Sequence, residues 1–217
     1  MFSKDWFTLE NKTMLLLGIF VAALTTANLL GSKITTLFGI RVSVGIFAFP
    51  ILFLITDIIA EVHGKKQAKK FVYIGLATQI MLFILLAISI FAPPNETWDN
   101  QDAYESIFSV SLRMIIASII AFFFSQLHDV FAFEYWKAKT KGKYLWFRNN
   151  ASTVVSQFID SMLFMYIAFY MITPNFTVGF IFTLVIPYWI IKIIFAFCDT
   201  PFVYLGARLL RGKSHSN

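Results

Sequence analysis

Six long apolar runs divide this chain of 217 residues, and they constrain its fold more than any other feature. Each run is long enough for a helix that crosses a bilayer, which needs about 17–25 residues. Backbone N–H and C=O groups in lipid must bond within their own segment, so each run is predicted to be a helix. We therefore expect an all-α integral membrane protein with one transmembrane domain over residues 1–217, whose helices span Thr13–Leu30, Ser43–Val62, Phe71–Phe91, Phe108–Trp136, Ala151–Ile172 and Phe176–Leu205.

Two of these runs carry further expectations. The sixth is long enough to tilt or bend, and Pro187 is the expected position of a kink. The first run is longer than the apolar part of a signal peptide, and no small-residue cleavage site follows it, so we expect a retained helix.

Composition agrees with a membrane protein. Hydrophobic residues make up 58% of the chain and charged residues 14%, whereas soluble domains average about 25% charged residues. The net charge of +6 would suit nucleic acid, but the basic residues gather in short loops between apolar runs. That distribution indicates a lipid bilayer as the partner and no nucleic acid. The single cysteine, Cys198, excludes a disulfide within the chain.

The loop charges predict the orientation. Basic residues fill the second loop, the fourth loop and the tail: Lys65, Lys66, Lys69, Lys70, Lys137, Lys139, Lys141, Lys143, Arg148, Arg208, Arg211 and Lys213. The third loop holds only acidic charges, at Glu96, Asp99, Asp102 and Glu105. By the positive-inside rule both termini and the even loops face the cytoplasm, with Lys33 and Arg41 as exceptions.

One polar pattern occurs twice inside the apolar runs: Ser125-Gln126-Leu-His-Asp129 and Ser156-Gln157-Phe-Ile-Asp160. An amide and a carboxylate three residues apart lie on one helix face. An Asp near the bilayer centre costs about 2.5–3.5 kcal/mol, so a chain that contains it twice is expected to use it. The predicted topology places both pairs in the inner half of the membrane, where they can line one polar cavity.

Other polar residues are candidates for the same cavity or for coupling and gating. Asn28, Asp57, Asn149 and Lys192 join the two Gln/Asp pairs as expected substrate-binding residues, and Glu61, Arg113, Arg148 and Asp199 are expected to act in coupling or gating. Simpler roles stay open for several of them. Serines and threonines often only join helices, Asn149 can cap a helix, Glu61 can be a boundary charge, and Lys192 can be a structural counter-ion of Asp160 or Asp199.

The third run carries only Gln79 as a strongly polar residue, so we expect it to pack against lipid or a partner. His63 and His128 are expected to be boundary residues. No Walker sequence, paired-cysteine motif or His-Glu-x-x-His motif is present, so we expect no ATP hydrolysis by this chain, no metal and no cofactor.

Several longer motifs together carry a family resemblance. They are Ala27-Asn-Leu-Leu-Gly-Ser-Lys-Ile34, Thr56-Asp57-Ile-Ile-Ala-Glu61-Val-His-Gly64, Trp146-x-Arg148-Asn149-Asn150-x-Ser152-Thr153-x-x-Ser156-Gln157-x-x-Asp160, and Asp199-Thr-Pro-Phe-Val-Tyr204. From about residue 20 to 205 the chain resembles the queuosine precursor transporter family, also called the vitamin uptake transporter family. His63 departs from the Tyr expected there and leaves the resemblance intact.

The resemblance implies six helices arranged similarly to the substrate-binding subunits of energy-coupling-factor importers. It also implies import of a 7-deazaguanine base, such as preQ0 or preQ1, across the prokaryotic plasma membrane. A guanine-like base presents two adjacent N–H donors that a carboxylate can accept, and an oxygen that an amide can bind. We expect one Gln/Asp pair to hold the base and the other to set its geometry or exchange a proton, with Asp57 and Glu61 as candidates for proton coupling.

Three functions remain to be separated. The first is a secondary transporter or facilitator, and the second is a binding subunit that docks on a separate ATP-driven module. The third is an intramembrane enzyme with Asp129 and Asp160 as a dyad. The neighbouring Gln residues and Lys192 suit recognition better than a dyad, so we expect no enzyme. A homodimer is left open.

Overall fold

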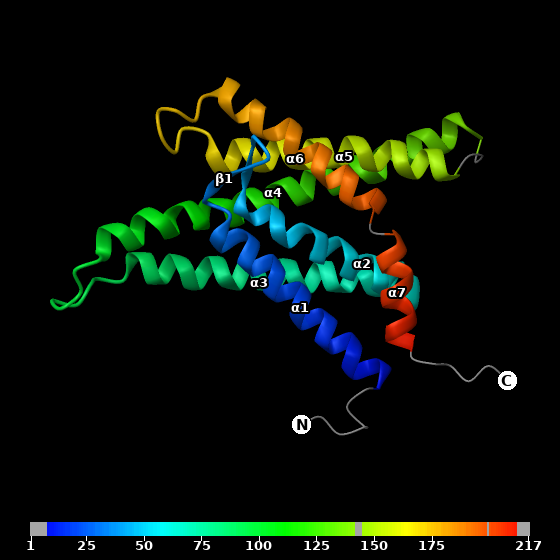
Figure 1. Ribbon diagram of the computed structural model, residues 1–217, viewed down its shortest axis with the longest axis horizontal. Coiled ribbons are helices and arrows are strands. Elements are labelled where there is room, and N and C mark those ends of the chain that lie inside the picture. The colour runs from blue at the N-terminus through cyan, green and yellow to red at the C-terminus, as the bar shows by residue number, and fades with distance from the viewer. Residues whose placement is uncertain (1–7, 142–144, 199, 212–217) are drawn as a thin grey trace.

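The computed structural model describes residues 8–141, 145–198 and 200–211, except for some side chains of α3–α7. It is a bundle of membrane-length helices with a small hairpin and a short last helix (Figure 1). In chain order the elements are α1 (Leu9–Leu30), β1 (Ile34–Leu37), β2 (Ile40–Ser43), the 3-10 helix η2 (Val44–Ala48), α2 (Phe49–His63), α3 (Lys65–Phe91), α4 (Gln101–Lys139), α5 (Leu145–Phe169), α6 (Val178–Cys198) and α7 (Thr200–Arg211).

The expected all-α membrane architecture is confirmed. Among the described residues, six helical segments are long and apolar enough to cross a membrane. Several helices begin or end beyond the apolar runs, because charged residues such as Lys and Glu continue a helix well outside the apolar region. At the start of α1, for example, the Thr8 hydroxyl accepts a hydrogen bond of 3.2 Å from the N–H of Asn11. This cap lies five residues before the predicted start of the span.

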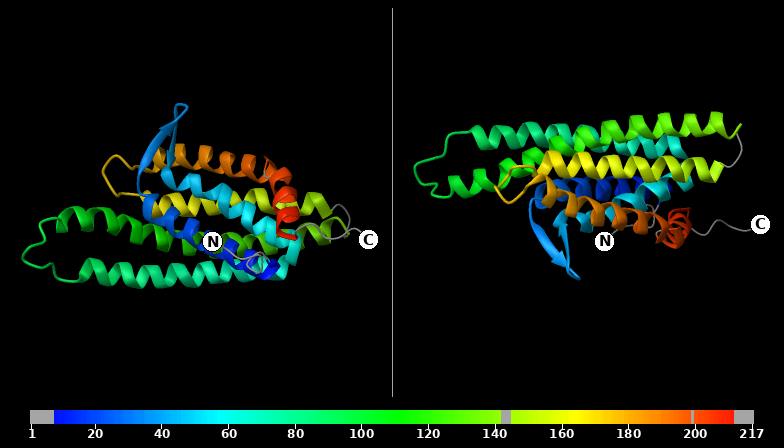
Figure 2. Two further views of the ribbon diagram at one scale, coloured as in Figure 1. Left: turned by 60° about the horizontal axis from the view of Figure 1, so that its bottom comes forward. Right: turned by 90° about the horizontal axis from the view of Figure 1, so that it is seen from above.

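The connection between the first two spans is a β-hairpin, which the sequence analysis did not predict. β1 and β2 pair in antiparallel register, with Ile34 opposite Ser43 and Leu37 opposite Ile40. The turn residues Phe38 and Gly39 have φ angles of 49° and 80°, and positive φ at both central residues is typical of a type I′ hairpin turn. The hairpin projects from one side of the bundle (Figure 2).

The sixth predicted span, Phe176–Leu205, is two helices, so its predicted end was wrong. α6 continues through Pro187 and ends at Cys198, and α7 then lies across the end of the bundle (Figure 1). The change of direction falls just before Pro201, and a proline there cannot donate the backbone hydrogen bond that a helix continuing from α6 would need. Proline is instead well tolerated in the first turn of a new helix.

Small side chains let α4 and α5 pack closely along much of their length (Figure 2). Small, almost fully buried residues recur on both helices, at Ala117 and Ala121 of α4 and at Ser152 and Ser156 of α5. The Ser156 hydroxyl lies 3.0 Å from Nδ1 of His128 on α4. Small residues at every fourth position are a common way for membrane helices to approach each other.

The start of α1, the end of α2 and the end of α7 meet at one end of the bundle. The Lys12 ammonium donates a hydrogen bond of 3.0 Å to the carbonyl of Leu209, and His63 Nε2 lies 2.9 Å from the Thr13 hydroxyl. Residues 8 and 211 therefore lie on the same side of the membrane domain. That this side is cytoplasmic remains a prediction from the loop charges.

Gly31 supplies the first stability test. A Cβ at Gly31 would lie 2.4 Å from the carbonyl oxygen of Ala27 and 2.5 Å from Met114 Cε, whereas one at Gly18 would meet nothing within 4 Å. Gly31 has ordinary helical dihedrals, so a substitution there acts through packing alone. We expect Gly31→Ala to destabilise the protein by about 1–3 kcal/mol. Gly18→Ala, the matched control on the same helix, should be neutral or stabilising by up to ~1 kcal/mol. Thermal unfolding in detergent measures both, and equal midpoints for the two variants would contradict this packing.

Candidate functional site

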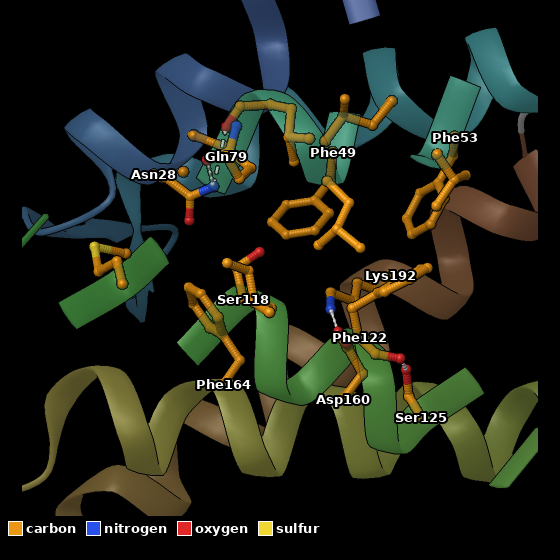
Figure 3. Close-up of a pocket in the computed structure, with 18 of the residues that line it drawn as sticks. Asn28, Phe49, Phe53, Gln79, Ser118, Phe122, Ser125, Asp160, Phe164 and Lys192 are labelled. Atoms are coloured by element: carbon orange, nitrogen blue, oxygen red, sulfur yellow. Dashed lines mark hydrogen bonds and ion pairs between the residues drawn. The ribbon is translucent and has the colours of Figure 1, made fainter. Parts of the chain in front are cut away.

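A cavity of about 320 Å³ lies at the centre of the six spanning helices. Cavities of roughly 300–1,000 Å³ are typical of small-molecule sites. Apolar and aromatic side chains form most of its wall (Figure 3). The polar side chains among its lining residues are those of Asn28 on α1, Ser43 at the end of β2, Thr56 on α2, Gln79 on α3, Ser118 and Ser125 on α4, Gln157 and Asp160 on α5, and Tyr188 and Lys192 on α6.

An ion pair between Asp160 and Lys192 dominates the electrostatics of this cavity. Lys192 Nζ lies 2.6 Å from Asp160 Oδ2, and the side chains are 2% and 21% exposed. The more accessible partner is therefore the carboxylate. A carboxylate offers about four acceptor positions, so the contact with Lys192 leaves acceptor capacity for a ligand in the cavity.

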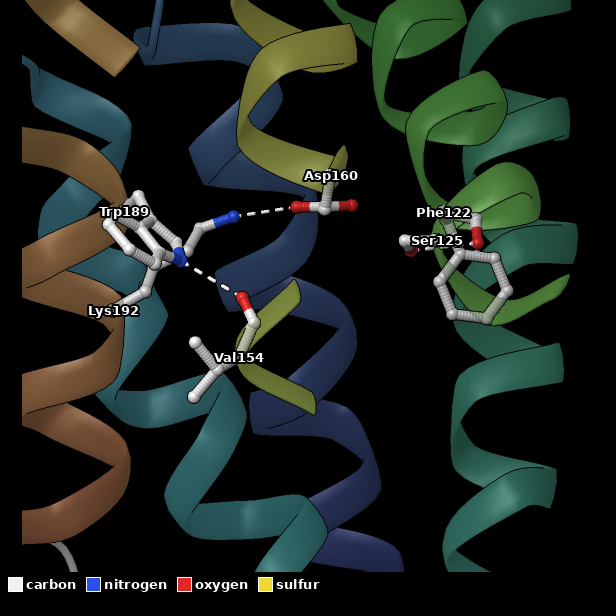
Figure 4. A network of polar contacts seen from close by, with 6 residues as sticks. All are labelled: Phe122, Ser125, Val154, Asp160, Trp189 and Lys192. Atoms are coloured by element: carbon white, nitrogen blue, oxygen red, sulfur yellow. Dashed lines mark hydrogen bonds and ion pairs between the residues drawn. The ribbon is translucent and has the colours of Figure 1, made fainter. Parts of the chain in front are cut away.

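A second bond joins the same two helices beside the ion pair. The indole Nε1 of Trp189 donates a hydrogen bond of 3.0 Å to the carbonyl of Val154. Figure 4 shows that both bonds connect α6 with α5, while Phe122 and Ser125 of α4 lie opposite them. The two bonds fix how α5 and α6 lie against each other and hence where the Asp160 carboxylate points.

Aromatic rings enclose the lysine and give the cavity flat surfaces. Lys192 Nζ lies 4.7 Å from the centre of the Phe49 ring and 5.1 Å from that of Tyr188, within the range of cation–π attraction. Phe49 meets Tyr188 edge to face at 5.3 Å, and Phe164 lies parallel to Tyr188 with an interplanar angle of 7°. A planar ligand would find aromatic faces from α2, α5 and α6 beside the ion pair.

Two amides form a separate polar group on the α1 and α3 side. Asn28 Nδ2 donates to Gln79 Oε1 at 2.9 Å and to the carbonyl of Leu24 at 3.2 Å. Asn28 and Gln79 are only 3% and 2% exposed. With its NH₂ group bonded in this way, Asn28 presents its oxygen to the cavity, as Ser118 does from α4 (Figure 3). Sequence reasoning missed Gln79, although its position as the one strongly polar residue of an apolar span was a usable signal.

Gln157 is available for a ligand. It lines the cavity one helical turn before Asp160, and its amide makes no hydrogen bond with any other residue that the structure describes. An amide carries both donors and an acceptor. Gln157 and Asp160 thus present complementary hydrogen-bonding groups from one face of α5, as the spacing in the sequence predicts.

The two copies of Ser-Gln-x-x-Asp are used differently. Ser156 lies in the α4–α5 contact, where its hydroxyl donates to the carbonyl of Ser152 at 2.8 Å and lies 3.0 Å from His128 Nδ1. Ser125 lines the cavity and donates to the carbonyl of Phe122 at 3.1 Å. Ser156 therefore joins two helices, which is the simpler of the two roles considered, whereas Ser125 bonds within its own helix and lines the cavity. The side chains of four candidates, Gln126, Asp129, Arg148 and Asn149, and the whole of Asp199 lie outside the described residues, so their roles stay predictions.

Three other candidates do not line the cavity. Asp57 is exposed and follows Thr56, which does line it. Glu61 is 47% exposed and lies 3.6 Å from Arg211 of α7. Arg113 donates hydrogen bonds of 2.6 Å to the carbonyls of Ile167 and Tyr170, and so caps the end of α5. The placement of Arg113 gives it a structural role, and its part in gating, like the coupling roles of Asp57 and Glu61, stays untested.

The ion pair leads to a stability prediction. Lys192→Met leaves the Asp160 carboxylate without its partner, and loss of one partner of a buried pair costs about 3–5 kcal/mol. We expect the lower end of this range because Asp160 is partly exposed. The double variant Asp160→Asn/Lys192→Met removes both charges and should be more stable than Lys192→Met alone. Lys70→Met, on an exposed lysine, is the control and should change stability by less than about 0.5 kcal/mol. Unfolding in detergent is measured for these variants, for Asp160→Asn alone and for the unchanged protein, and strictly additive effects of the two single substitutions would contradict the pairing.

The comparisons with known proteins agree on one family for this chain. Residues 43–206 match the family described as "Putative vitamin uptake transporter". The chain is 31% identical over 206 residues to "Probable queuosine precursor transporter" of Bacillus subtilis (strain 168), a match that covers 93% of this chain and 88% of the relative. It is 23% identical over 164 residues to "Queuosine precursor transporter" of Escherichia coli (strain K12), covering 75% of this chain and 72% of the relative. No solved structure matches the chain significantly.

These matches confirm the resemblance that the sequence motifs indicate. With six membrane-length helices, they identify an integral protein of the plasma membrane that is a transporter rather than an enzyme. The chain belongs to the vitamin uptake transporter family.

Proposed function

We propose that this protein imports a queuosine precursor, a 7-deazaguanine base such as preQ0 or preQ1, by secondary transport. The observation that carries the proposal is the Asp160 carboxylate, which lies among aromatic rings in a central cavity and is 21% exposed while its partner Lys192 is buried. The names of the curated relatives support the ligand class, because those proteins are described as queuosine precursor transporters.

Recognition of the base follows from the groups around Asp160. A guanine-like ring presents the N1 N–H and the 2-amino group side by side, and one carboxylate accepts both with charge-assisted hydrogen bonds. The Gln157 amide, one turn away on the same helix face, donates to the oxygen at position 6 of the ring. Phe49, Phe164 and Tyr188 supply aromatic surfaces for stacking.

The remaining candidates take supporting parts in this proposal. Lys192 balances the charge of Asp160 and holds its carboxylate in one orientation. Asn28, fixed by Gln79, offers an acceptor on the opposite side of the cavity. Asp57, Glu61, Asp129, Arg148 and Asp199 are kept as candidates for coupling or gating, and Gln126 and Asn149 as candidates for binding.

Uptake by cells that cannot make the precursor tests the site. We expect Asp160→Asn to lower uptake of the base by roughly tenfold or more, since a hydrogen bond to a charged group is worth about 1.5–3 kcal/mol and ~1.4 kcal/mol is tenfold. Gln157→Ala removes a neutral hydrogen bond of about 0.5–1.5 kcal/mol, so it should lower uptake by roughly twofold to tenfold. The matched controls are Asp102→Asn and Gln101→Ala at the start of α4, outside the cavity, and they should transport normally. Surface levels of every variant are measured by immunoblot, and unchanged uptake in both cavity variants would refute the site.

Liposomes that contain only this protein test the mode of transport. We expect accumulation of radiolabelled base that rises with an imposed proton gradient. A binding subunit of an ATP-driven importer would bind the base with the same residues but would not accumulate it alone. Equal entry with and without the gradient would contradict proton coupling and leave facilitated diffusion.

A further inference from the structure

The last helix has the orientation of a helix in the membrane surface. In Figure 1, α3, α4 and α5 run along the long axis of the molecule, whereas α7 runs across it and is viewed almost end-on in the right panel of Figure 2. It crosses the end of the bundle where α1 begins and α2 ends. The ends of membrane-spanning helices are where the headgroups of a bilayer are expected.

Close packing and polar bonds hold α7 in this position. A Cβ at Gly206 would lie 2.2 Å from Ile58 Cδ1 of α2, so the two helices meet closely at this point. Ala207 and Leu210 are each 4% exposed. At the end of the helix the Arg211 guanidinium donates to the carbonyl of Glu61 at 2.8 Å. One face of α7 is therefore packed against the rest of the protein.

A second face of α7 is apolar and uncovered. Phe202, Leu205 and Leu209 are 60%, 56% and 65% exposed. Their spacing of three and four residues places them on one stripe of the helix. The stripe is about a third of a turn away from the face that contacts α2, given 3.6 residues per turn. The packing of α7 thus leaves three large apolar side chains facing outward.

A third face of the same helix is basic. Arg208 and Arg211 are three residues apart, with Tyr204 one turn before Arg208, and all three are exposed. More basic residues gather at this end of the bundle, because Lys66, Lys69 and Lys70 are exposed at the start of α3, directly after α2. An apolar stripe beside a basic one is the pattern of helices that bind anionic membrane surfaces.

We propose that α7 lies in the membrane surface and binds anionic lipid headgroups through Arg208, with Phe202, Leu205 and Leu209 inserted among the acyl chains. A lipid surface fits better than a second protein because the two uncovered faces of α7 together meet both demands of a headgroup boundary, one being apolar and the other cationic. The site is separate from the central cavity. Because α6 carries Lys192 and precedes α7 in the chain, lipid bound to α7 also restrains the end of α6.

Site-specific labels test this placement in lipid nanodiscs. Cys198 is the only cysteine, so Cys198→Ser gives a background in which Leu205→Cys carries a single NBD fluorophore. Met81→Cys on the exposed face of α3 is the reference for ordinary lipid contact, and Thr97→Cys in the exposed loop before α4 is the reference for water. The probes are phosphatidylglycerol and phosphatidylcholine with brominated acyl chains, at equal mole fraction, and iodide in the water.

We expect both brominated lipids to quench the label at residue 205, and iodide to quench it far less than at residue 97. The ratio of phosphatidylglycerol to phosphatidylcholine quenching should be roughly twofold or more above the ratio at residue 81. Arg208→Gln should bring this ratio to the reference value, and Arg208→Lys should keep it.

Three results would overturn the proposal. Strong iodide quenching at residue 205 would place α7 in water. Protection from both iodide and brominated lipid would mean that another protein chain covers the stripe. Equal ratios at residues 205 and 81 would show that anionic lipid has no preference for this helix.

Discussion

The ion pair between Asp160 and Lys192 is the constraint on which the rest of the cavity depends. Either charge alone in the middle of a helix bundle would be costly, since the interior provides little solvation. At 2.6 Å the two groups offset each other, and they do so only if α5 and α6 keep one relative position. The Trp189–Val154 bond holds that position. The rings of Phe49 and Tyr188 then pack around the lysine, and the cavity forms on the carboxylate side.

The sequence predicted the parts of the fold that depend on solvent alone. Each apolar run had to be helical because lipid leaves its backbone no other hydrogen-bond partner, and the structure has six membrane-length helical segments, although the sixth run divides into α6 and α7. A counter-ion for Lys192 was also expected, because a charge near the midplane needs one. The sequence did not decide between Asp160 and Asp199 for this part.

Features set by tertiary contact or by local backbone geometry were missed. The hairpin at residues 34–43 depends on Phe38, a residue rarely found at positive φ, in the first turn position. The division of the sixth span falls just before Pro201, whereas α6 continues through Pro187. Proline begins a helix as readily as it bends one, and hydropathy does not separate the two. Gln79 was not recognised as a residue of the cavity, because its hydrogen-bond partner Asn28 is 51 residues away in the sequence.

The repeated Ser-Gln-x-x-Asp pattern shows why a motif alone does not assign a role to each residue. On α5, Gln157 and Asp160 face the cavity. Ser156, one position before Gln157, faces α4 instead, and its hydroxyl lies within hydrogen-bond distance of His128 Nδ1. A step of one residue rotates a side chain by more than a quarter of a turn, so adjacent residues of one motif serve different neighbours. The serine is small enough to let the helices approach, and that approach brings α4 close enough to form the opposite wall.

The charge balance of the described lining residues also limits what the proposed site can carry. Asp160 and Lys192 are its one acidic and one basic side chain, so the pair adds no net charge to the cavity. A neutral planar base that bonds to Asp160 leaves this balance intact, and its passage needs no separate ion to solvate it. A ligand with a fixed positive charge would compete with Lys192 for the same carboxylate and would leave the buried ammonium with only the rings of Phe49 and Tyr188. Cation–π attraction of about 2 kcal/mol when desolvated offsets only part of the several kcal/mol that a buried charge costs. In the proposed site, the same ion pair that allows two charges inside the membrane therefore favours a neutral base such as preQ0 over preQ1, whose aminomethyl group is protonated near neutral pH.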